Sequence, residues 1–253
     1  MEKVAVIIPT TQGLSRVQQI RIDEQLRHAV MTVNFRTERS TVTIDYAEYV
    51  ARDAGIISRL TQEYRYRVKL SRDIITGSSW KLGMLAAHVL KQSDALAEVD
   101  TPFGDNATAA ELVGDSERVV WATGDVSDEY GVLPVAQVKR KLELSQSLFE
   151  WCQKHSIPVK LYLPNELDDD PHEHQANEIL LQKLARQFSV LSIQRLKQAP
   201  KRVQGWGVSN ESSPRPAKDN SKSLMKPFVV VAAALTGAVA LFMGVLNLGG
   251  ETS

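Results

Sequence analysis

Short apolar stretches alternate with amphipathic ones through the first 197 residues of the chain. Continuously apolar stretches, and stretches that alternate apolar and polar residues with a period of two, predict strands at residues 3–9, 39–45, 65–71, 118–126, 157–164 and 189–196. Apolar positions at helical spacing predict helices at residues 46–64, 78–92, 135–155 and 173–188. The helix at 78–92 begins with serine, which is a favourable N-cap. Because strands and helices alternate, the pattern predicts an α/β domain at residues 1–197.

A different pattern marks the C-terminal part of the chain. Residues 228–248 contain no charged side chain, and their only polar side chains are those of Thr236 and Asn247. At about 1.5 Å per residue, a helix of this length spans roughly 30 Å, the thickness of the hydrocarbon core of a bilayer. The sequence therefore predicts one transmembrane helix at residues 227–249 and a short tail at 250–253. A helix buried in the domain core is the alternative, and it is disfavoured because the segment is apolar on every side.

The residues between the domain and this apolar segment predict a flexible basic linker at 198–226. They are rich in Ser, Asn and Pro and offer almost nothing to bury. Their Lys and Arg side chains outnumber the two acidic ones, Glu211 and Asp219, and the tail contains no basic residue. By the positive-inside rule the linker and the N-terminal domain face the cytoplasm. We therefore expect a single-pass membrane protein.

Composition and charge exclude several classes of function. The chain has 30 Lys+Arg and 30 Asp+Glu, so its formal net charge is zero and nothing indicates a nucleic-acid partner. Cys152 is the only cysteine and cannot form an internal disulfide. The N-terminal apolar run at residues 4–9 is too short for a secretory signal. No Gly-Lys pair occurs, which excludes a Walker-type ATP site, and no dinucleotide fingerprint is present, so no cofactor is expected.

The histidines indicate neither a metal site nor a catalytic triad. His172 and His174 lie in an acidic segment that we interpret as a solvated loop, although its residue types could ligate a metal. His88 and His155 lie on predicted helices without an obvious acidic partner. Residues 92–117 are acidic and contain loop-forming Pro and Gly, and they predict an inserted loop with a short helix.

The remaining candidate chemistry is a serine paired with a lysine. Residues 76–83 place Ser79 at a strand-to-helix turn, where the N–H groups of a helix start can stabilise an oxyanion. Residues 132–142 place lysines at a later strand-to-helix turn. Desolvation lowers the pKa of a lysine, which can then take the proton of a serine near neutral pH.

Two stretches resemble the proteolytic domain of the Lon protease family. Residues 123–142, TGDVSDEYGVLPVAQVKRKL, resemble the family's run from Thr-Gly-Glu through a hairpin and Val-Leu-Pro-Val-Gly-Gly-Leu-Lys to the catalytic lysine. Residues 75–90, ITGSSWKLGMLAAHVL, fall where the family has Asp-Gly-Pro-Ser-Ala-Gly and its helix. The resemblance covers about residues 40–196 in the same order of elements. It implies the α/β (α+β) fold of that domain, built from βαβ units.

The resemblance implies a serine endopeptidase with a Ser-Lys dyad. It assigns Ser79 as the nucleophile, Lys139 as the general base and Thr123 as the residue that orients the lysine amine. Gly77 would allow the tight turn before the nucleophile. Peptide bonds would be cleaved through an acyl-enzyme, without a metal or a cofactor.

The chain departs from the family pattern around both motifs. Trp80 and Lys81 follow the serine instead of Ala-Gly, and Ala136 and Gln137 replace the Gly-Gly before the lysine. A bulky tryptophan at this place is expected to narrow the cleft. These changes leave open an alternative function, a catalytically inactive Lon-like interaction or scaffold domain tethered to the membrane. Catalysis requires the lysine to be buried within reach of the serine, and a lysine pointing to solvent would favour the alternative.

The resemblance also implies partners. Lon proteolytic domains are coupled to an AAA+ unfoldase, in the same chain or as a separate subunit, and no such segment is evident in this sequence. We therefore expect a small or unfolded protein or peptide substrate, or a separate AAA+ unfoldase. The family's proteolytic domains form closed rings, which implies a homo-oligomer. The C-terminal helix would contact membrane lipid.

Overall fold

The computed structural model describes residues 1–208 except for residues 37, 105 and 168–169. Seven of its strands form one mixed sheet: β1 (Val4–Thr10), β2 (Gly13–Ile22), β3 (Val30–Val33), β4 (Tyr66–Leu70), β5 (Arg118–Ala122), β8 (Val159–Pro164) and β9 (Leu191–Leu196). Their order is β3-β4-β2-β1-β5-β8-β9. β2 runs antiparallel to both of its neighbours, and the other adjacent pairs are parallel. A separate hairpin is formed by β6 (Asp125–Val126) and β7 (Val132–Leu133).

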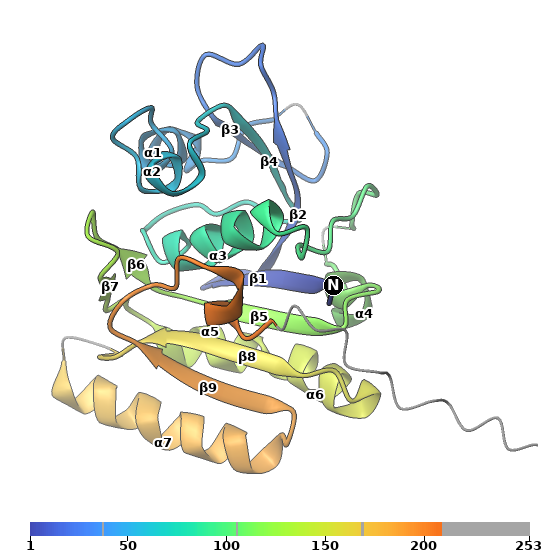
Figure 1. The fold of residues 1–253 in the computed structure, drawn as a ribbon. Helices are drawn as coiled ribbons and strands as arrows, with labels where there is room; N and C mark the ends of the chain where they lie inside the picture. Colours follow the sequence, from blue (N-terminus) through green and yellow to red (C-terminus); the bar gives the residue numbers. More distant parts are fainter. Residues whose placement is uncertain (37, 105, 168–169, 209–253) are drawn as a thin grey trace, which may run out of the picture. The chain divides into compact units, whose positions relative to one another are not determined.

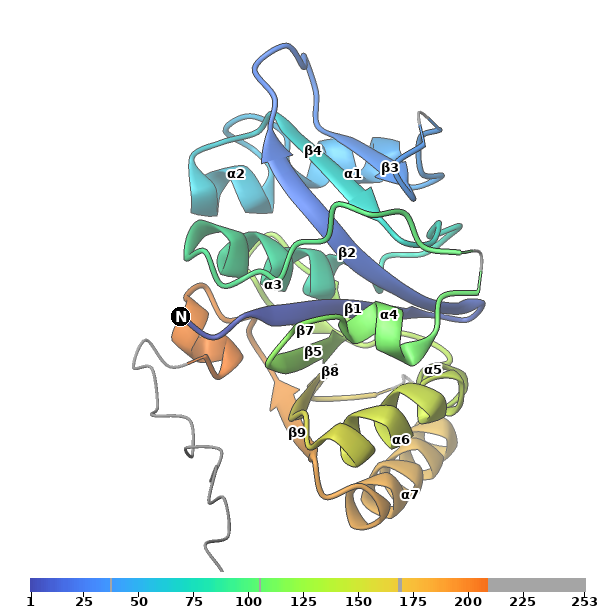
Figure 2. The ribbon, with the colours of Figure 1, turned by 90° about the vertical axis from the view of Figure 1, so that its right-hand side faces the viewer.

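Helices cover both faces of this sheet (Figures 1 and 2). They are α1 (Thr43–Tyr49), α2 (Ile56–Thr61), α3 (Lys81–Gln92), α4 (Ala109–Val113), α5 (Val138–Leu144), α6 (Gln146–His155), α7 (Pro171–Gln187) and a 3-10 turn, η1 (Val203–Trp206). The first three helices and η1 share one core, and α4 to α7 share the other. This arrangement confirms the predicted α/β class.

β1 is buried on both faces because its side chains enter the two cores alternately. Val4, Val6 and Ile8 pack with α3, whereas Ala5 and Ile7 pack with the helices of the opposite face. A central strand buried on both faces reads as a continuous apolar run, which is the pattern that predicted it. Strands at 65–71, 157–164 and 189–196 are confirmed as β4, β8 and β9, and the predicted strand 118–126 is β5 followed by β6.

The predicted strand at 39–45 is wrong, because hydroxyl groups organise a turn and a helix there. Ser40 and Thr41 donate side-chain hydrogen bonds to Asp73, at 2.5 and 2.7 Å. The hydroxyl of Thr43 bonds both the N–H and the C=O of Met31, at 2.8 and 2.9 Å. Such side-chain bonds compete with a sheet ladder. The alternation of residue types therefore did not produce a strand.

Two predicted helices are each broken into two. The segment 46–64 becomes α1 and α2, separated before Gly55, and 135–155 becomes α5 and α6, separated at Ser145. The Ser145 hydroxyl is buried, accepts a 2.9 Å hydrogen bond from Trp121 Nε1 and donates one of 2.7 Å to Lys141 O. This bonding holds the chain at the junction and anchors α5 to β5.

The predicted loop at 92–117 is a strap that runs beside β1 and β2. Val4 N donates to Ala95 O and Ala97 N donates to Val4 O, each at 2.8 Å. The short helix expected in this insertion is α4, which begins with a capping box formed by Thr108 and Glu111. The strap therefore belongs to the folded unit.

The folded unit continues beyond the predicted boundary at residue 197. Residues 198–208 were expected to belong to the linker, but Val203 and Trp206 of η1 are buried, and Trp206 packs edge-to-face on Tyr162 with 4.7 Å between ring centroids. The rest of that linker and the predicted transmembrane helix at 227–249 lie outside the described residues. Among the residues that are described, no helix is long and apolar enough to cross a membrane.

Candidate functional site

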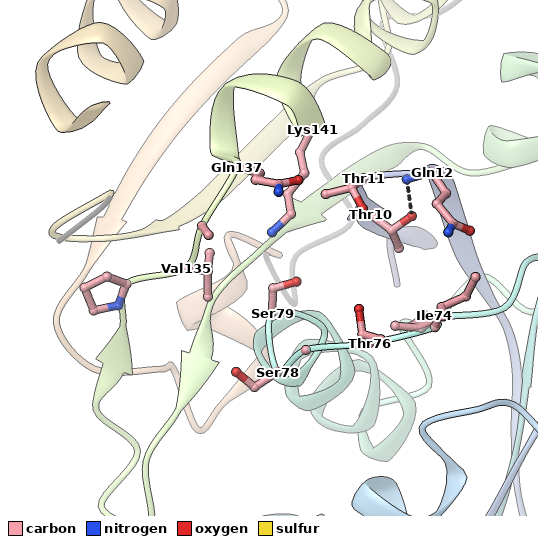
Figure 3. Close-up of a pocket in the computed structure, with 14 residues that line it drawn as sticks. Thr10, Thr11, Gln12, Ile74, Thr76, Ser78, Ser79, Val135, Gln137 and Lys141 are labelled. Carbon is pink, nitrogen blue, oxygen red and sulfur yellow. Dashed lines mark hydrogen bonds between the residues drawn. The ribbon is translucent and has the colours of Figure 1, made fainter. Parts of the chain in front are cut away.

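A pocket of about 370 Å³ lies where three chain segments that are distant in the sequence meet. Its walls are the turn between β1 and β2 (residues 10–12), the segment before α3 (74–79) and the segment before α5 (134–137), together with Lys141. Figure 3 shows Ser79 and Lys141 reaching into it from different elements. The structure therefore brings the serine and a lysine to one site.

Ser79 lies two residues before the first residue of α3. Gly77 has a φ of +82°, a conformation that a side chain would strain, and it turns the chain before the serine. The N–H of Gly124 donates a 3.0 Å hydrogen bond to Ser79 O, which ties this turn to the end of β5. The predicted serine N-cap is not formed, because the helix begins after Trp80 without a side-chain cap. Ser79 Oγ thus has no capping role, and Figure 3 shows it on the side of the turn that faces Lys141.

Lys141 lies on α5 and is only 3% exposed. Its ammonium donates a 3.2 Å hydrogen bond to Thr123 Oγ1, and Thr123 is fully buried at the end of β5. Burial lowers the pKa of Lys141 from 10.5 to about 8, because desolvation disfavours the charged form. At pH 7 roughly a tenth of this lysine is therefore neutral and able to act as a general base, whereas an ordinary lysine is almost entirely charged.

Lys139 does not take the place expected for it. It is exposed, and it is not among the residues that line the pocket. Residues two positions apart in an α-helix are separated by about 200° around the helix axis, so Lys139 and Lys141 face nearly opposite directions. The prediction that Lys139 is the lysine buried near the serine is corrected to Lys141. Thr123 does bind a lysine amine, as expected, but that of Lys141.

The helix pattern contained a signal for the correct lysine. Val138 and Leu142 are one turn apart and fully buried, which defines the inner face of α5. Lys141 lies three residues after Val138 and next to Leu142, so it shares that face. Lys139 and Arg140 fall on the outer face.

The start of α3 supplies unused hydrogen-bond donors. Among the described residues, no backbone carbonyl accepts a hydrogen bond from the N–H of Ser79 or Trp80. These groups lie at the N-terminal end of a 12-residue helix, where the helix dipole favours negative charge. An oxyanion formed on a carbonyl attacked by Ser79 would find its donors here.

Trp80 and Lys81, which depart from the family pattern after the serine, do not line the pocket. Trp80 is fully buried and packs edge-to-face on Tyr46 and Tyr49, with centroid distances of 6.3 and 5.5 Å. It is not among the residues that line the 370 Å³ pocket. Lys81 forms a 2.9 Å ion pair with Asp125. The narrowing expected from Trp80 is therefore not found.

Other titratable candidates carry no comparable site. His88 is buried against Tyr46, with 2.9 Å between Nε2 and the hydroxyl oxygen, and burial lowers its pKa to about 3. Burial also raises the pKa of Cys152 to about 12, which leaves the thiol protonated and unreactive. His174 Nδ1 accepts a hydrogen bond from the N–H of Leu167 at 3.1 Å. Over the part of the chain that is described, no group of three or more His, Cys, Asp or Glu residues could hold a metal ion.

Comparisons with known proteins add no assignment. No model of a protein family matches the chain, and no curated protein matches it. Any function must therefore be argued from the residues and the geometry of the pocket.

Proposed function

We propose that this chain is a serine endopeptidase of the Lon-like type, in which Ser79 is the nucleophile and Lys141 the general base. The observation that carries the proposal is the environment of Lys141. It is a buried lysine with a lowered pKa, held by Thr123 at the wall of a pocket that also contains a serine hydroxyl. A structural lysine gains nothing from such burial, since desolvation of an ammonium destabilises the fold.

The proposed reaction follows from these positions. Neutral Lys141 accepts the proton of Ser79 Oγ while the oxygen attacks the carbonyl carbon of a peptide bond. The N–H groups of Ser79 and Trp80 stabilise the negative charge that develops on the carbonyl oxygen. The protonated lysine then gives its proton to the leaving amine, which yields the acyl-enzyme. Water, deprotonated by Lys141, attacks the ester carbonyl, the bond to Ser79 Oγ breaks, and Lys141 returns the proton to Oγ as the acid leaves.

Thr123 has a positioning role in this proposal. Its hydroxyl accepts a hydrogen bond from the lysine amine at 3.2 Å, while its own N–H donates to Tyr162 O at 3.2 Å and so fixes it to β8. The lysine amine therefore keeps one orientation in the pocket. Its lone pair is then available to the serine proton.

We also propose a membrane location and partners, on the sequence alone. The apolar segment 227–249 anchors the chain, and the basic residues before it keep the catalytic domain on the cytoplasmic side. A protein or peptide is the substrate, and a homo-oligomer and a separate AAA+ unfoldase are the proposed protein partners. The inactive scaffold is the competing function, and an open pocket with a buried lysine favours catalysis over it.

Cleavage of unfolded casein by the full chain tests the proposal. We expect activity in the wild type and in two matched controls, Ser78→Ala and Lys139→Met. We expect none in Ser79→Ala or Lys141→Met. Figure 3 supports the first control, because Ser78 points away from Lys141. A wild-type chain that cleaves neither casein nor short peptides, or cleavage that survives Ser79→Ala, would refute the proposed function.

A further inference from the structure

A second cavity, of about 760 Å³, adjoins the first. Gly77 and Ser78 line both of them. The other walls of the second cavity come from α1, from the start of α2, from Trp80 and Lys81, and from the β6–β7 hairpin. In the proposed reaction the acyl group of the substrate is bonded to Ser79, the next residue along the chain. The side chain on the acyl side of the scissile bond is therefore held close to this cavity.

Buried aromatic and aliphatic groups form part of its lining. Tyr49, Ile56 and Val126 are each less than 10% exposed, and Trp80 is fully buried. The indole Nε1 of Trp80 is buried and has no hydrogen-bond partner among the described residues.

The remaining lining is charged, with a surplus of carboxylates. Three exposed carboxylates have neither an ion pair nor a side-chain hydrogen bond among the described residues: those of Asp45, Glu48 and Asp128. Of the two cations in the lining, Lys81 is paired with Asp125 at 2.9 Å, whereas Arg59 donates to the backbone carbonyl of Asp128 and lies over the ring of Tyr130. The guanidinium of Arg59 therefore offsets one of the three carboxylates, and the lining keeps a net negative charge.

We propose that this second cavity receives the substrate side chain on the acyl side of the scissile bond and selects lysine or arginine there. The aliphatic part of such a side chain packs on Tyr49 and Ile56, and its cationic end lies among the three carboxylates. The inference rests on the proposed function, since it names the substrate class of that site. A short aliphatic side chain would leave the carboxylates unpaired, and an acidic one would be repelled.

Fluorogenic tripeptides test this preference on the full chain. The peptides acetyl-Ala-Ala-Xaa-aminomethylcoumarin carry Lys, Arg, norleucine or Glu at Xaa, and norleucine matches the aliphatic stem of lysine without its charge. One partly exposed charge pair contributes roughly a factor of two to five, so we expect kcat/KM for Lys and Arg to exceed that for norleucine by about tenfold. The double variant Asp45→Asn/Glu48→Gln should reduce that ratio by about fivefold. Glu129→Gln is the matched control, because Glu129 is an exposed acid outside the cavity.

The outcomes separate this inference from the proposed function. Cleavage that requires Ser79 but favours norleucine or Glu, or a Lys preference that the double variant does not change, would overturn the cationic subsite and leave the protease intact. Absence of any Ser79-dependent cleavage would overturn both. A Lys and Arg preference that falls in the double variant and persists in Glu129→Gln establishes the subsite.

Discussion

Replacing Lys141 with methionine should stabilise the protein at neutral pH while it removes the proposed base. Burial lowers the pKa of Lys141 from 10.5 to about 8, so the folded state binds its proton less tightly than the unfolded chain does. At about 1.4 kcal/mol per tenfold change, a fall from 10.5 to about 8 corresponds to about 3 kcal/mol. That free energy opposes folding whenever the lysine is charged. Methionine fills a similar volume and carries no charge.

Proton linkage sets the direction of this stability difference and the pH range over which it changes. Below pH 8 the lysine is charged in both states, and its cost is fully present. Between pH 8 and 10.5 the folded state has lost the proton and the unfolded state still holds it, so the wild type gains stability as the pH rises. The advantage of Lys141→Met should therefore fall from about 3 kcal/mol at pH 7 to about 1 kcal/mol at pH 10. Loss of the hydrogen bond to Thr123 reduces the advantage at every pH by a similar amount and does not alter this difference.

Urea denaturation at pH 7 and pH 10, followed by tryptophan fluorescence, measures the effect. Lys139→Met is the matched control, because Lys139 lies on the same helix and is exposed. Its free energy of unfolding should differ from that of the wild type by less than about 0.5 kcal/mol at both pH values. An advantage of Lys141→Met that does not change between pH 7 and pH 10 would show that Lys141 is not desolvated, and the assignment of the base would lose its support.

Three further predictions concern the same site and the backbone and helix packing around it. Because Lys141 must be neutral to act as a base, kcat/KM for peptide cleavage should rise about tenfold per pH unit below pH 8 and level off above pH 8. A flat pH profile of kcat/KM from pH 6 to 9 would contradict this role. Gln137 has a φ of +61° at the start of α5, a left-handed conformation that glycine adopts without strain. Gln137→Gly should therefore raise the free energy of unfolding by about 0.5 to 1 kcal/mol in urea denaturation. A loss of stability would show that the backbone at Gln137 is not strained. An added methyl group at Gly83 would lie 2.7 Å from Ile8 Cγ1, so Gly83→Ala should lower the free energy of unfolding by about 2 kcal/mol. Gly104→Ala should be neutral, because no atom of the described residues lies within 4 Å of the added methyl group. Equal effects of the two substitutions would refute the close packing of α3 on β1.

The parts of the fold that depend on local pattern could be predicted from the sequence. β1, β4, β8 and β9 have apolar runs or alternation that their burial requires, and α3 and α7 have a clear helical period. β2 could not be predicted in this way, because its buried positions include polar side chains such as Arg16, which donates hydrogen bonds to the carbonyls of Ala97 and Leu112. Such burial depends on partners that are distant in the sequence.

Of the residues predicted for the site, Ser79 lines the pocket and Thr123 bonds a buried lysine, whereas Lys139 is exposed. Gly77, two residues before Ser79, has the positive φ that the turn requires, and this glycine is visible in the sequence. The choice between Lys139 and Lys141 depends on the rotation of α5, which is set by the burial of Val138 and by the packing of the helix on the sheet. A motif aligned residue by residue does not contain that rotation.

Trapping the acyl-enzyme tests the central claim most directly. The full chain is mixed with an activated peptide ester at pH 8, quenched with acid within seconds, and analysed by mass spectrometry after digestion. The dyad of Ser79 and Lys141 predicts an acyl group on Ser79 in the wild type and in Lys139→Met, and none in Lys141→Met. An acyl group on Ser78, or labelling of Ser79 that is equally fast in Lys141→Met, would contradict the proposed pairing.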